Sequence, residues 1–149
     1  LLPGVFELIE WLKKQQCHIG IVSNSDDITL ASAVEKNSLP IDNLVSSEMA
    51  KYYKPNSKIF EFALKKWNCS PELCIYIGNS MNDVRASSSA GISCVHIHSE
   101  MFDVSCHSEG VYICQVKEIL ECKKIIKIFL ENNNFEEAIK KCPEPESNQ

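Results

Sequence analysis

The chain has 149 residues, 44% of them hydrophobic and 23% charged, which is ordinary for one globular domain with a buried core. Its formal net charge of −5 gives no electrostatic support for binding to nucleic acid or to an anionic membrane surface. The longest apolar runs have the length of a strand, so the sequence predicts no membrane-spanning helix.

Hydrophobic periodicity predicts helices and strands that alternate along the chain. Apolar residues at helical spacing predict a helix over residues 3–15, and the branched apolar run CHIGIVS predicts a buried strand over 17–23. The remaining predicted elements are, in order, helix 28–37, strand 43–47, helix 57–67, strand 74–78, helix 82–90, strand 93–98, strand 110–114, helix 116–130 and a short helix at 135–141.

This alternation predicts an α/β fold with an open, doubly wound parallel sheet. We expect residues 1–114 to form the core, 115–141 to form helices that pack on it, and 142–149 to be a disordered tail. The helix at 116–130 is apolar on one side, which favours a cover for the sheet over a partner surface. In such sheets ligands bind beyond the carboxyl ends of the strands. Polar residues that directly follow a strand are therefore the candidate site residues.

The first such signal is IVSNSD, in which Ser23 ends a predicted strand and Asn24 follows it. A hydroxyl beside the backbone N–H groups of a tight turn can hold a phosphate oxygen. Ser, Asn and Asp are also good helix N-caps. Taken alone, the pattern favours the cap.

Two further signals occur later in the chain. In YYKPNSKIFEFAL, Pro55 restricts Lys54 to an extended backbone just before a helix, so its ammonium can point back toward the strand ends. In YIGNSMND, Asn79 stands at the end of a strand and Asp83 one helical turn later. Two oxygen ligands placed in this way can converge on a hard cation such as Mg²⁺. Each pattern also fits a simple helix start.

In combination, these stretches resemble the haloacid dehalogenase-like (HAD-like) hydrolase superfamily. IVSNSD is similar to its second motif, KPNSKIFEFAL to its third, and YIGNSMND followed by the Ala-Gly-Ile run of 90–92 to its fourth. The resemblance covers about residues 2–98 and is nearest to eukaryotic phosphatases with this domain. It implies a Rossmann-like core, of which this chain holds the C-terminal portion.

The resemblance also implies a chemistry, namely Mg²⁺-dependent hydrolysis of a small phosphorylated metabolite through a phospho-aspartyl intermediate. It makes Ser23, Asn24 and Lys54 the phosphate-binding residues, with Ser23 and Lys54 serving catalysis, and it makes Asp83 and Asn79 the metal ligands. A cytoplasmic protein is expected, with no nucleic-acid or membrane partner.

The chain departs from the family pattern at two points. The first motif, Asp-x-Asp-x-Thr after an apolar strand, does not occur in this sequence. The chain starts at Leu1 rather than Met, so we expect an N-terminal segment outside it to supply the nucleophile, the cap and the first strand. The second departure is Asn79, a neutral amide where the family has an aspartate, which predicts weaker Mg²⁺ binding.

These departures leave an alternative function open, that of a catalytically inactive relative that binds or regulates. A metal-free dehalogenase fits poorly, because the asparagine of that pattern would stand where this chain has Ser80.

The cysteine and histidine pattern does not favour a metal site of its own. Cys94, His96 and His98 alternate along a predicted strand, with Cys106 and His107 further on, but the Cys-x-x-Cys pairs of a closed zinc module do not occur in the sequence. The chain has eight cysteines and no secretory signal at its start, which predicts free thiols in a reducing compartment.

Overall fold

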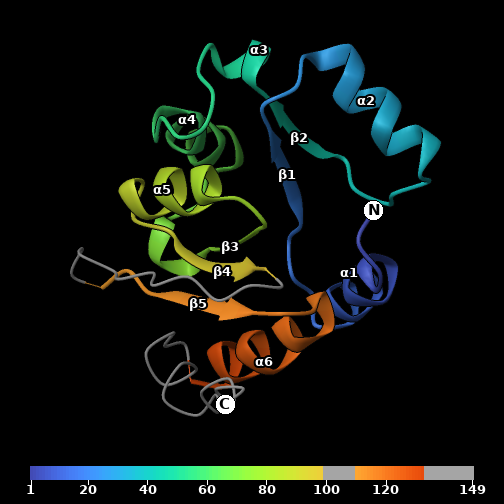
Figure 1. The fold of residues 1–149 in the computed structure, drawn as a ribbon, viewed down its shortest axis with the longest axis vertical. Coiled ribbons are helices and arrows are strands. Elements are labelled where there is room, and N and C mark those ends of the chain that lie inside the picture. The colour runs from blue at the N-terminus through green and yellow to red at the C-terminus, as the bar shows by residue number, and fades with distance from the viewer. Residues whose placement is uncertain (99–109, 133–149) are drawn as a thin grey trace.

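The computed structural model describes residues 1–98 and 110–132 (Figure 1). Its elements are, in chain order, α1 (Val5–Lys14), β1 (Gly20–Ser23), α2 (Asp27–Lys36), β2 (Asn43–Ser46), α3 (Ser47–Ala50), α4 (Lys58–Trp67), the 3₁₀ turn η1 (Pro71–Leu73), β3 (Ile75–Gly78), α5 (Met81–Ser89), β4 (Ser93–Ile97), β5 (Ile113–Val116), the 3₁₀ turn η2 (Ile119–Glu121) and α6 (Cys122–Asn132). None of the helices in these two ranges has the length and apolar character needed to cross a membrane.

The strands confirm the predicted α/β class with parallel pairing. β1 pairs with β2, and β4 pairs with β3 on one side and β5 on the other, every pair being parallel. Within the described ranges, however, β1 and β3 are not paired with each other, so the strands form two sheets of two and three strands. One edge of β1 and one edge of β3 therefore lack a strand neighbour among the described residues.

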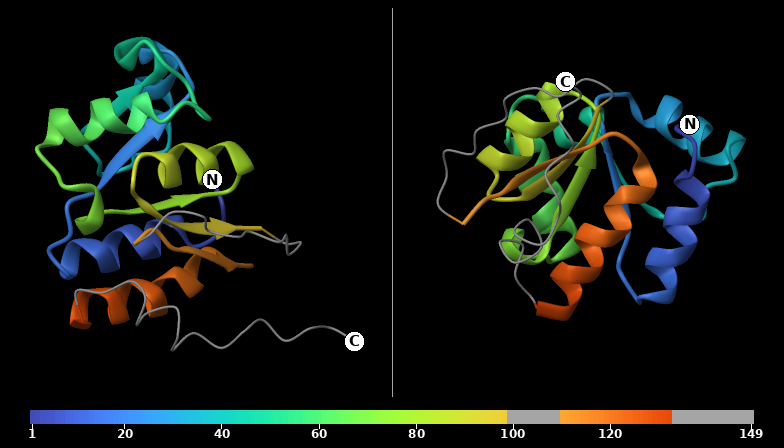
Figure 2. Two further views of the ribbon diagram at one scale, coloured as in Figure 1. Left: turned by 90° about the vertical axis from the view of Figure 1, so that its left-hand side faces the viewer. Right: turned by 60° about the horizontal axis from the view of Figure 1, so that its bottom comes forward.

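Two apolar clusters hold the sheets and helices together. The first joins β4 and β5 to α1 and α6, which lie side by side in Figures 1 and 2, and includes Leu8, Val95 and Ile125. The second joins β1 and β2 to α4 and α5, and includes Val45 and Phe60. Each of these five residues is at most 4% exposed, so α1, α4 and α6 each have an apolar face against a sheet.

The bounds of the first eight predicted elements are close to the observed ones, whereas the C-terminal prediction was displaced. β5 begins three residues later than the expected strand at 110–114, and the helix expected from 116 begins at Cys122. The helix begins late because of Glu121, whose carboxylate accepts hydrogen bonds from the backbone N–H groups of Lys117 and Glu118. These bonds hold the chain in a turn before the helix, a feature that apolar periodicity does not report.

Periodicity also missed α3, a single turn that the Ser46 hydroxyl caps by accepting from the backbone N–H of Met49. The predicted helix at 135–141 and the predicted tail at 142–149 lie outside the described residues. The division at residues 114 and 141 stays a prediction.

Candidate active site

The three polar stretches that the sequence singled out meet at the carboxyl ends of β1 and β3. The contact between them is made by Lys54, which lies in the loop between α3 and α4. Its Nζ donates to the backbone oxygen of Val22 in β1 (3.1 Å), to the Tyr76 hydroxyl in β3 (3.0 Å) and to Asp83 Oδ1 in α5 (2.6 Å). One ammonium group thus bridges the two sheets, with an acceptor for each of its three protons.

Asp83 is held as firmly as the lysine. Its Oδ2 accepts from the backbone N–H groups of Asn79 (3.1 Å) and Ser80 (3.0 Å) and from the Ser80 hydroxyl (2.9 Å). Ser80 in turn caps α5 by accepting from the Asp83 backbone N–H, so the two residues form a capping box. The helix start that the sequence offered as an alternative reading is therefore real, and it orients the carboxylate toward Lys54.

A glycine allows this turn to be so tight. A Cβ atom added at Gly78 would lie 2.6 Å from Asp83 Cβ and 2.7 Å from its Cγ. Real Cβ atoms do not approach carbon so closely, so any larger residue would push the Asp83 side chain away from its position. Gly78 is thus part of the site through its missing side chain.

Burial and charge set the protonation of this cluster. The side chains of Lys54 and Asp83 are 11% and 7% exposed. Burial alone would raise the pKa of Asp83, but the hydrogen bond and the positive charge of Lys54, with the hydrogen bonds of Ser80, outweigh it and lower that pKa below its ordinary value. Burial and the neighbouring Asp83 carboxylate raise the pKa of Tyr76 well above its ordinary value. At neutral pH the site therefore holds an ion pair and a neutral phenol.

Ser23 and Asn24 lie beside Lys54 but already have protein partners. Ser23 Oγ is 2.8 Å from Ser25 Oγ and accepts from the Ser25 backbone N–H (3.2 Å). The Asn24 side chain bonds to the backbone of Lys54 at both ends, accepting from its N–H (2.7 Å) and donating to its oxygen (3.0 Å). The structure therefore brings Ser23, Asn24, Lys54 and Asp83 together, and their assignment to phosphate and metal binding stays a prediction.

The oxygen ligands of this region do not make a magnesium site. Both carboxylate oxygens of Asp83 are engaged by protein donors, and Asn79 offers only a neutral amide. Among residues 1–98 and 110–132, no three His, Cys, Asp or Glu side chains are grouped so that they could hold a metal ion. Asp83 and Asn79 by themselves do not fit Mg²⁺.

The described part of the structure gives no support for a zinc site at Cys94, His96 and His98. His96 and His98 stack with their ring centres 5.6 Å apart, and burial, followed by the charge of His98, lowers the pKa of His96. Cys106 and His107 lie outside the described residues. The six cysteines that the structure describes are not joined in disulfides to one another.

Sequence reasoning missed Tyr76. Its hydroxyl, besides accepting from Lys54, lies 3.2 Å from Asp83 Oδ1 and 3.3 Å from the Val22 oxygen. The available signal was a phenol inside an otherwise apolar predicted strand, because a hydroxyl that becomes buried needs a hydrogen-bond partner.

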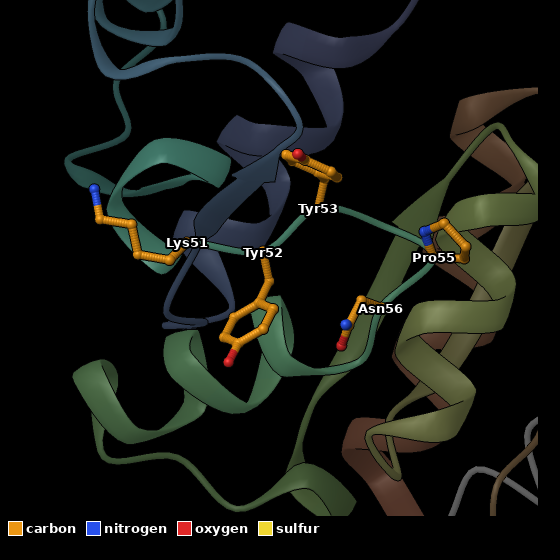
Figure 3. Close-up of a pocket in the computed structure, with 5 residues that line it drawn as sticks. All are labelled: Lys51, Tyr52, Tyr53, Pro55 and Asn56. Carbon is orange, nitrogen blue, oxygen red and sulfur yellow. The ribbon is translucent and has the colours of Figure 1, made fainter.

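The loop that carries Lys54 also borders a hollow of about 460 Å³, which is lined by Lys51, Tyr52, Tyr53, Pro55 and Asn56 (Figure 3). The side chains of Tyr52 and Asn56 extend to one side of the loop, and Tyr53 extends to the other. Lys54 is not among the lining residues, so the hollow is not the site of the ion pair.

Comparison with known proteins shows the family of the chain. Residues 1–97 match the family model described as haloacid dehalogenase-like hydrolase. The chain is 29% identical, over 83% of its length, to a glyceraldehyde 3-phosphate phosphatase of Methanothermobacter thermautotrophicus, and covers 58% of that protein. It is 26% identical, over 62% of its length, to phosphoglycolate phosphatase 1 of Pseudomonas aeruginosa, and covers 35% of that protein.

A solved structure shows the same fold. The hydrolase of this superfamily from Ehrlichia chaffeensis aligns with a TM-score of 0.73 at 24% identity, covering 89% of this chain and 60% of the other. The chain thus spans between about a third and three fifths of the length of the proteins it matches.

Proposed function

Because the chain belongs to the haloacid dehalogenase-like hydrolase family, we propose that the protein is a phosphatase of a small phosphorylated metabolite. The reaction proceeds through a phospho-aspartyl intermediate. The nucleophilic aspartate comes from a segment outside this chain, since no Asp-x-Asp motif occurs in the sequence.

The observation that carries the proposal is the ammonium of Lys54, buried where β1, β3 and α5 meet. A fixed positive charge in a site with little water stabilises the charge that develops when a carboxylate attacks a phosphoryl group. The chemistry needs such a charge beside both the nucleophile and the phosphoryl oxygens. Ser23 and Asn24, at the end of β1 beside the Lys54 loop, supply a hydroxyl and backbone N–H groups for those oxygens.

The proposed reaction has two displacements. A carboxylate oxygen of the outside aspartate bonds to phosphorus, the bond from phosphorus to the ester oxygen breaks, and that oxygen leaves as an alcohol after taking a proton from a neighbouring acid. Water then attacks the phospho-aspartate, giving inorganic phosphate and the free carboxylate. In both steps Lys54 offsets negative charge, and the Ser23 hydroxyl turns from Ser25 to donate to a phosphoryl oxygen.

A Mg²⁺ cofactor in the complete protein would need carboxylates from the same outside segment, because Asp83 and Asn79 do not suffice. In this proposal a strand from that segment lies between β1 and β3. Each of these strands has one edge without a strand neighbour among the described residues, and side chains rather than main-chain bonds span the distance between them. A strand placed there would join the two sheets into one.

A second candidate function is phosphate binding or regulation without turnover. Asn79 favours it, because this amide removes one negative charge where the family has an aspartate. Both candidates use Ser23 and Lys54 for phosphate, and they differ only in whether a phosphate ester is hydrolysed.

The test is release of inorganic phosphate by the full-length natural protein from glyceraldehyde 3-phosphate, phosphoglycolate and other small phosphate esters, with Mg²⁺ present. We expect turnover of at least one ester, strongly reduced by Ser23→Ala and unchanged by Lys123→Ala on the far surface. Saturable binding of the esters without any phosphate release would instead establish the second function. If the protein neither binds nor hydrolyses any of the esters, both candidate functions are refuted.

A further inference from the structure

We propose that Asn24 is a positioning residue whose side chain fixes the backbone of Lys54 and so determines where the Lys54 ammonium lies. The importance of that location for phosphoryl transfer rests on the proposed function, whereas the positioning itself does not. This role differs from the direct phosphate contact that the motif suggests for Asn24.

The evidence begins with a pair of hydrogen bonds between residues thirty positions apart. Asn24 Oδ1 accepts from the Lys54 N–H (2.7 Å), and Asn24 Nδ2 donates to the Lys54 oxygen (3.0 Å). A carboxamide has the same donor and acceptor geometry as a peptide group, so this pair acts like one rung of a sheet ladder between the end of β1 and the lysine loop. An ionised Asp at position 24 has only acceptors and could not make the bond to the Lys54 oxygen.

Asn24 is itself held in place. The Ser47 hydroxyl, from the first turn of α3, is within hydrogen-bond distance of the backbone oxygens of both Asn24 (2.8 Å) and Ser25 (3.0 Å). The Ser47 backbone N–H also donates to the Ser25 oxygen (3.1 Å). Ser47 is only 9% exposed. Ser47 therefore holds the backbone at Asn24 and Ser25 by hydrogen bonds, and the Asn24 side chain holds the backbone of Lys54.

The lysine needs such support because its own stem is flexible. Four methylene groups separate the Lys54 backbone from its ammonium, which must reach acceptors on β1, β3 and α5 at the same time. The next residue, Pro55, has no backbone N–H to anchor the loop. Tyr53, on the other side, is 67% exposed. Fixing the Lys54 backbone from Asn24 limits the positions that the ammonium can adopt.

The positioning role also explains why the Asn24 side chain is poorly placed to act as a phosphate ligand. Its oxygen and its nitrogen are each already committed to Lys54. The group at position 24 that remains for an anion is the backbone N–H, which any residue but proline supplies. Removing the side chain should therefore act through Lys54 and not through lost contact with the phosphate.

The first experiment observes Lys54 directly, by ¹⁵N-resolved NMR of lysine ammonium groups in the full-length protein. A buried ammonium with three protein acceptors exchanges its protons slowly, so the wild type should give a Lys54 signal, identified by its loss in Lys54→Arg. Asn24→Ala should abolish that signal and Asn24→Asp, which keeps only the acceptor, should broaden it. Asn56→Ala is the matched control, because Asn56 lies in the same loop but bonds to the backbone of Lys58.

The second experiment is a double-mutant cycle on the rate of phosphate-ester hydrolysis. We expect Asn24→Ala to lower kcat by about tenfold with little change in KM, since a misplaced charge weakens transition-state stabilisation. In a Lys54→Ala background the same substitution should change kcat less than about twofold, because the residue it positions is gone. Circular dichroism checks that each variant is folded. If Asn24→Ala does not fold, Asn24→Asp takes its place in the cycle.

The outcomes separate the two proposals. A Lys54 signal that is absent in the wild type or unchanged in both Asn24 variants overturns the positioning role, whatever the activity. An equal loss of kcat in the presence and absence of Lys54 overturns it too, because Asn24 would then act on the fold as a whole. If the NMR result is as expected but no ester is hydrolysed, positioning stands and the proposed phosphatase function fails.

Discussion

Replacing Lys54 by methionine should destabilise the protein far more than the same change at a surface ion pair. Lys54→Met removes one partner of an ion pair with an N–O distance of 2.6 Å whose side chains are 11% and 7% exposed. Breaking a buried pair in this way costs about 3–5 kcal/mol, because the remaining charge stays buried without compensation. Since Asp83 Oδ2 keeps its three donors, we expect a value at the lower end, about 3 kcal/mol.

The matched control is Lys123→Met. Lys123 pairs with Glu7 at 2.7 Å, but the two side chains are 25% and 62% exposed. Solvent screens such a pair, so its loss should cost no more than about 0.5 kcal/mol. Urea unfolding followed by circular dichroism at pH 7 measures both. At an m-value of about 2 kcal/mol per molar, the midpoint should fall by about 1.5 M for Lys54→Met and by only about 0.25 M for Lys123→Met.

The destabilisation caused by Lys54→Met should depend on pH, because Asp83 must be ionised for the ion pair to form. The pKa of Asp83 in the folded protein lies below its ordinary value of 3.8. The stability that Lys54 confers through this carboxylate is therefore fully present above pH 3.8 and is lost as the pH falls through the lowered folded value. The difference between wild type and Lys54→Met should be largest near pH 7 and shrink in acid, because Asp83 without Lys54 takes up its proton at a higher pH than Asp83 in the wild type. Equal costs for the two lysine variants, or a difference that grows in acid, would refute the reasoning.

Three further predictions concern the turn after β3 and the thiols. Gly78→Ala should lower the free energy of unfolding by about 2 kcal/mol and reduce any phosphatase activity, because the new methyl group displaces Asp83; unchanged values in both assays would show that the turn can relax. Asn79→Asp in the full-length protein should lower the Mg²⁺ concentration needed for half-maximal rate, since it restores a negative charge; an unchanged or higher requirement would argue against a metal role for this position. Cys94 and Cys122, whose pKa values burial raises to about 12, should resist iodoacetamide at pH 8 in the native protein and react in urea, as read by mass spectrometry; alkylation at equal rates in both states would contradict their burial.

The sequence predicted the convergence of Ser23, Lys54 and Asp83 because each follows a parallel strand or opens the next helix, and such ends gather at one edge of a sheet. It did not predict the contacts among them. That Lys54 would use all three of its protons on Val22, Tyr76 and Asp83 depends on side-chain reach between two sheets, which spacing along the chain does not encode.

The same distinction applies to Asn24. Its motif suggested a phosphate ligand or a helix cap, and the structure bonds its amide to a backbone thirty residues away. The actual cap of α2 is Asp26, whose side chain accepts from the Thr29 N–H. At the C-terminal end, apolar periodicity placed a strand and a helix several residues too early, and hydrogen bonds to Glu121 hold the turn that delays the helix. Helix caps, element boundaries and side-chain partners thus depend on local polar contacts, which hydrophobic patterning does not predict.

The most direct test of the proposed phosphatase is the rate of p-nitrophenyl phosphate hydrolysis by the full-length protein with Mg²⁺, compared with its Lys54→Ala variant and with the 149-residue chain alone. We predict measurable turnover in the full-length protein, a loss of at least about a hundredfold in the variant, and no turnover by the chain alone. Turnover that persists in Lys54→Ala, or turnover by the isolated chain, would contradict the account.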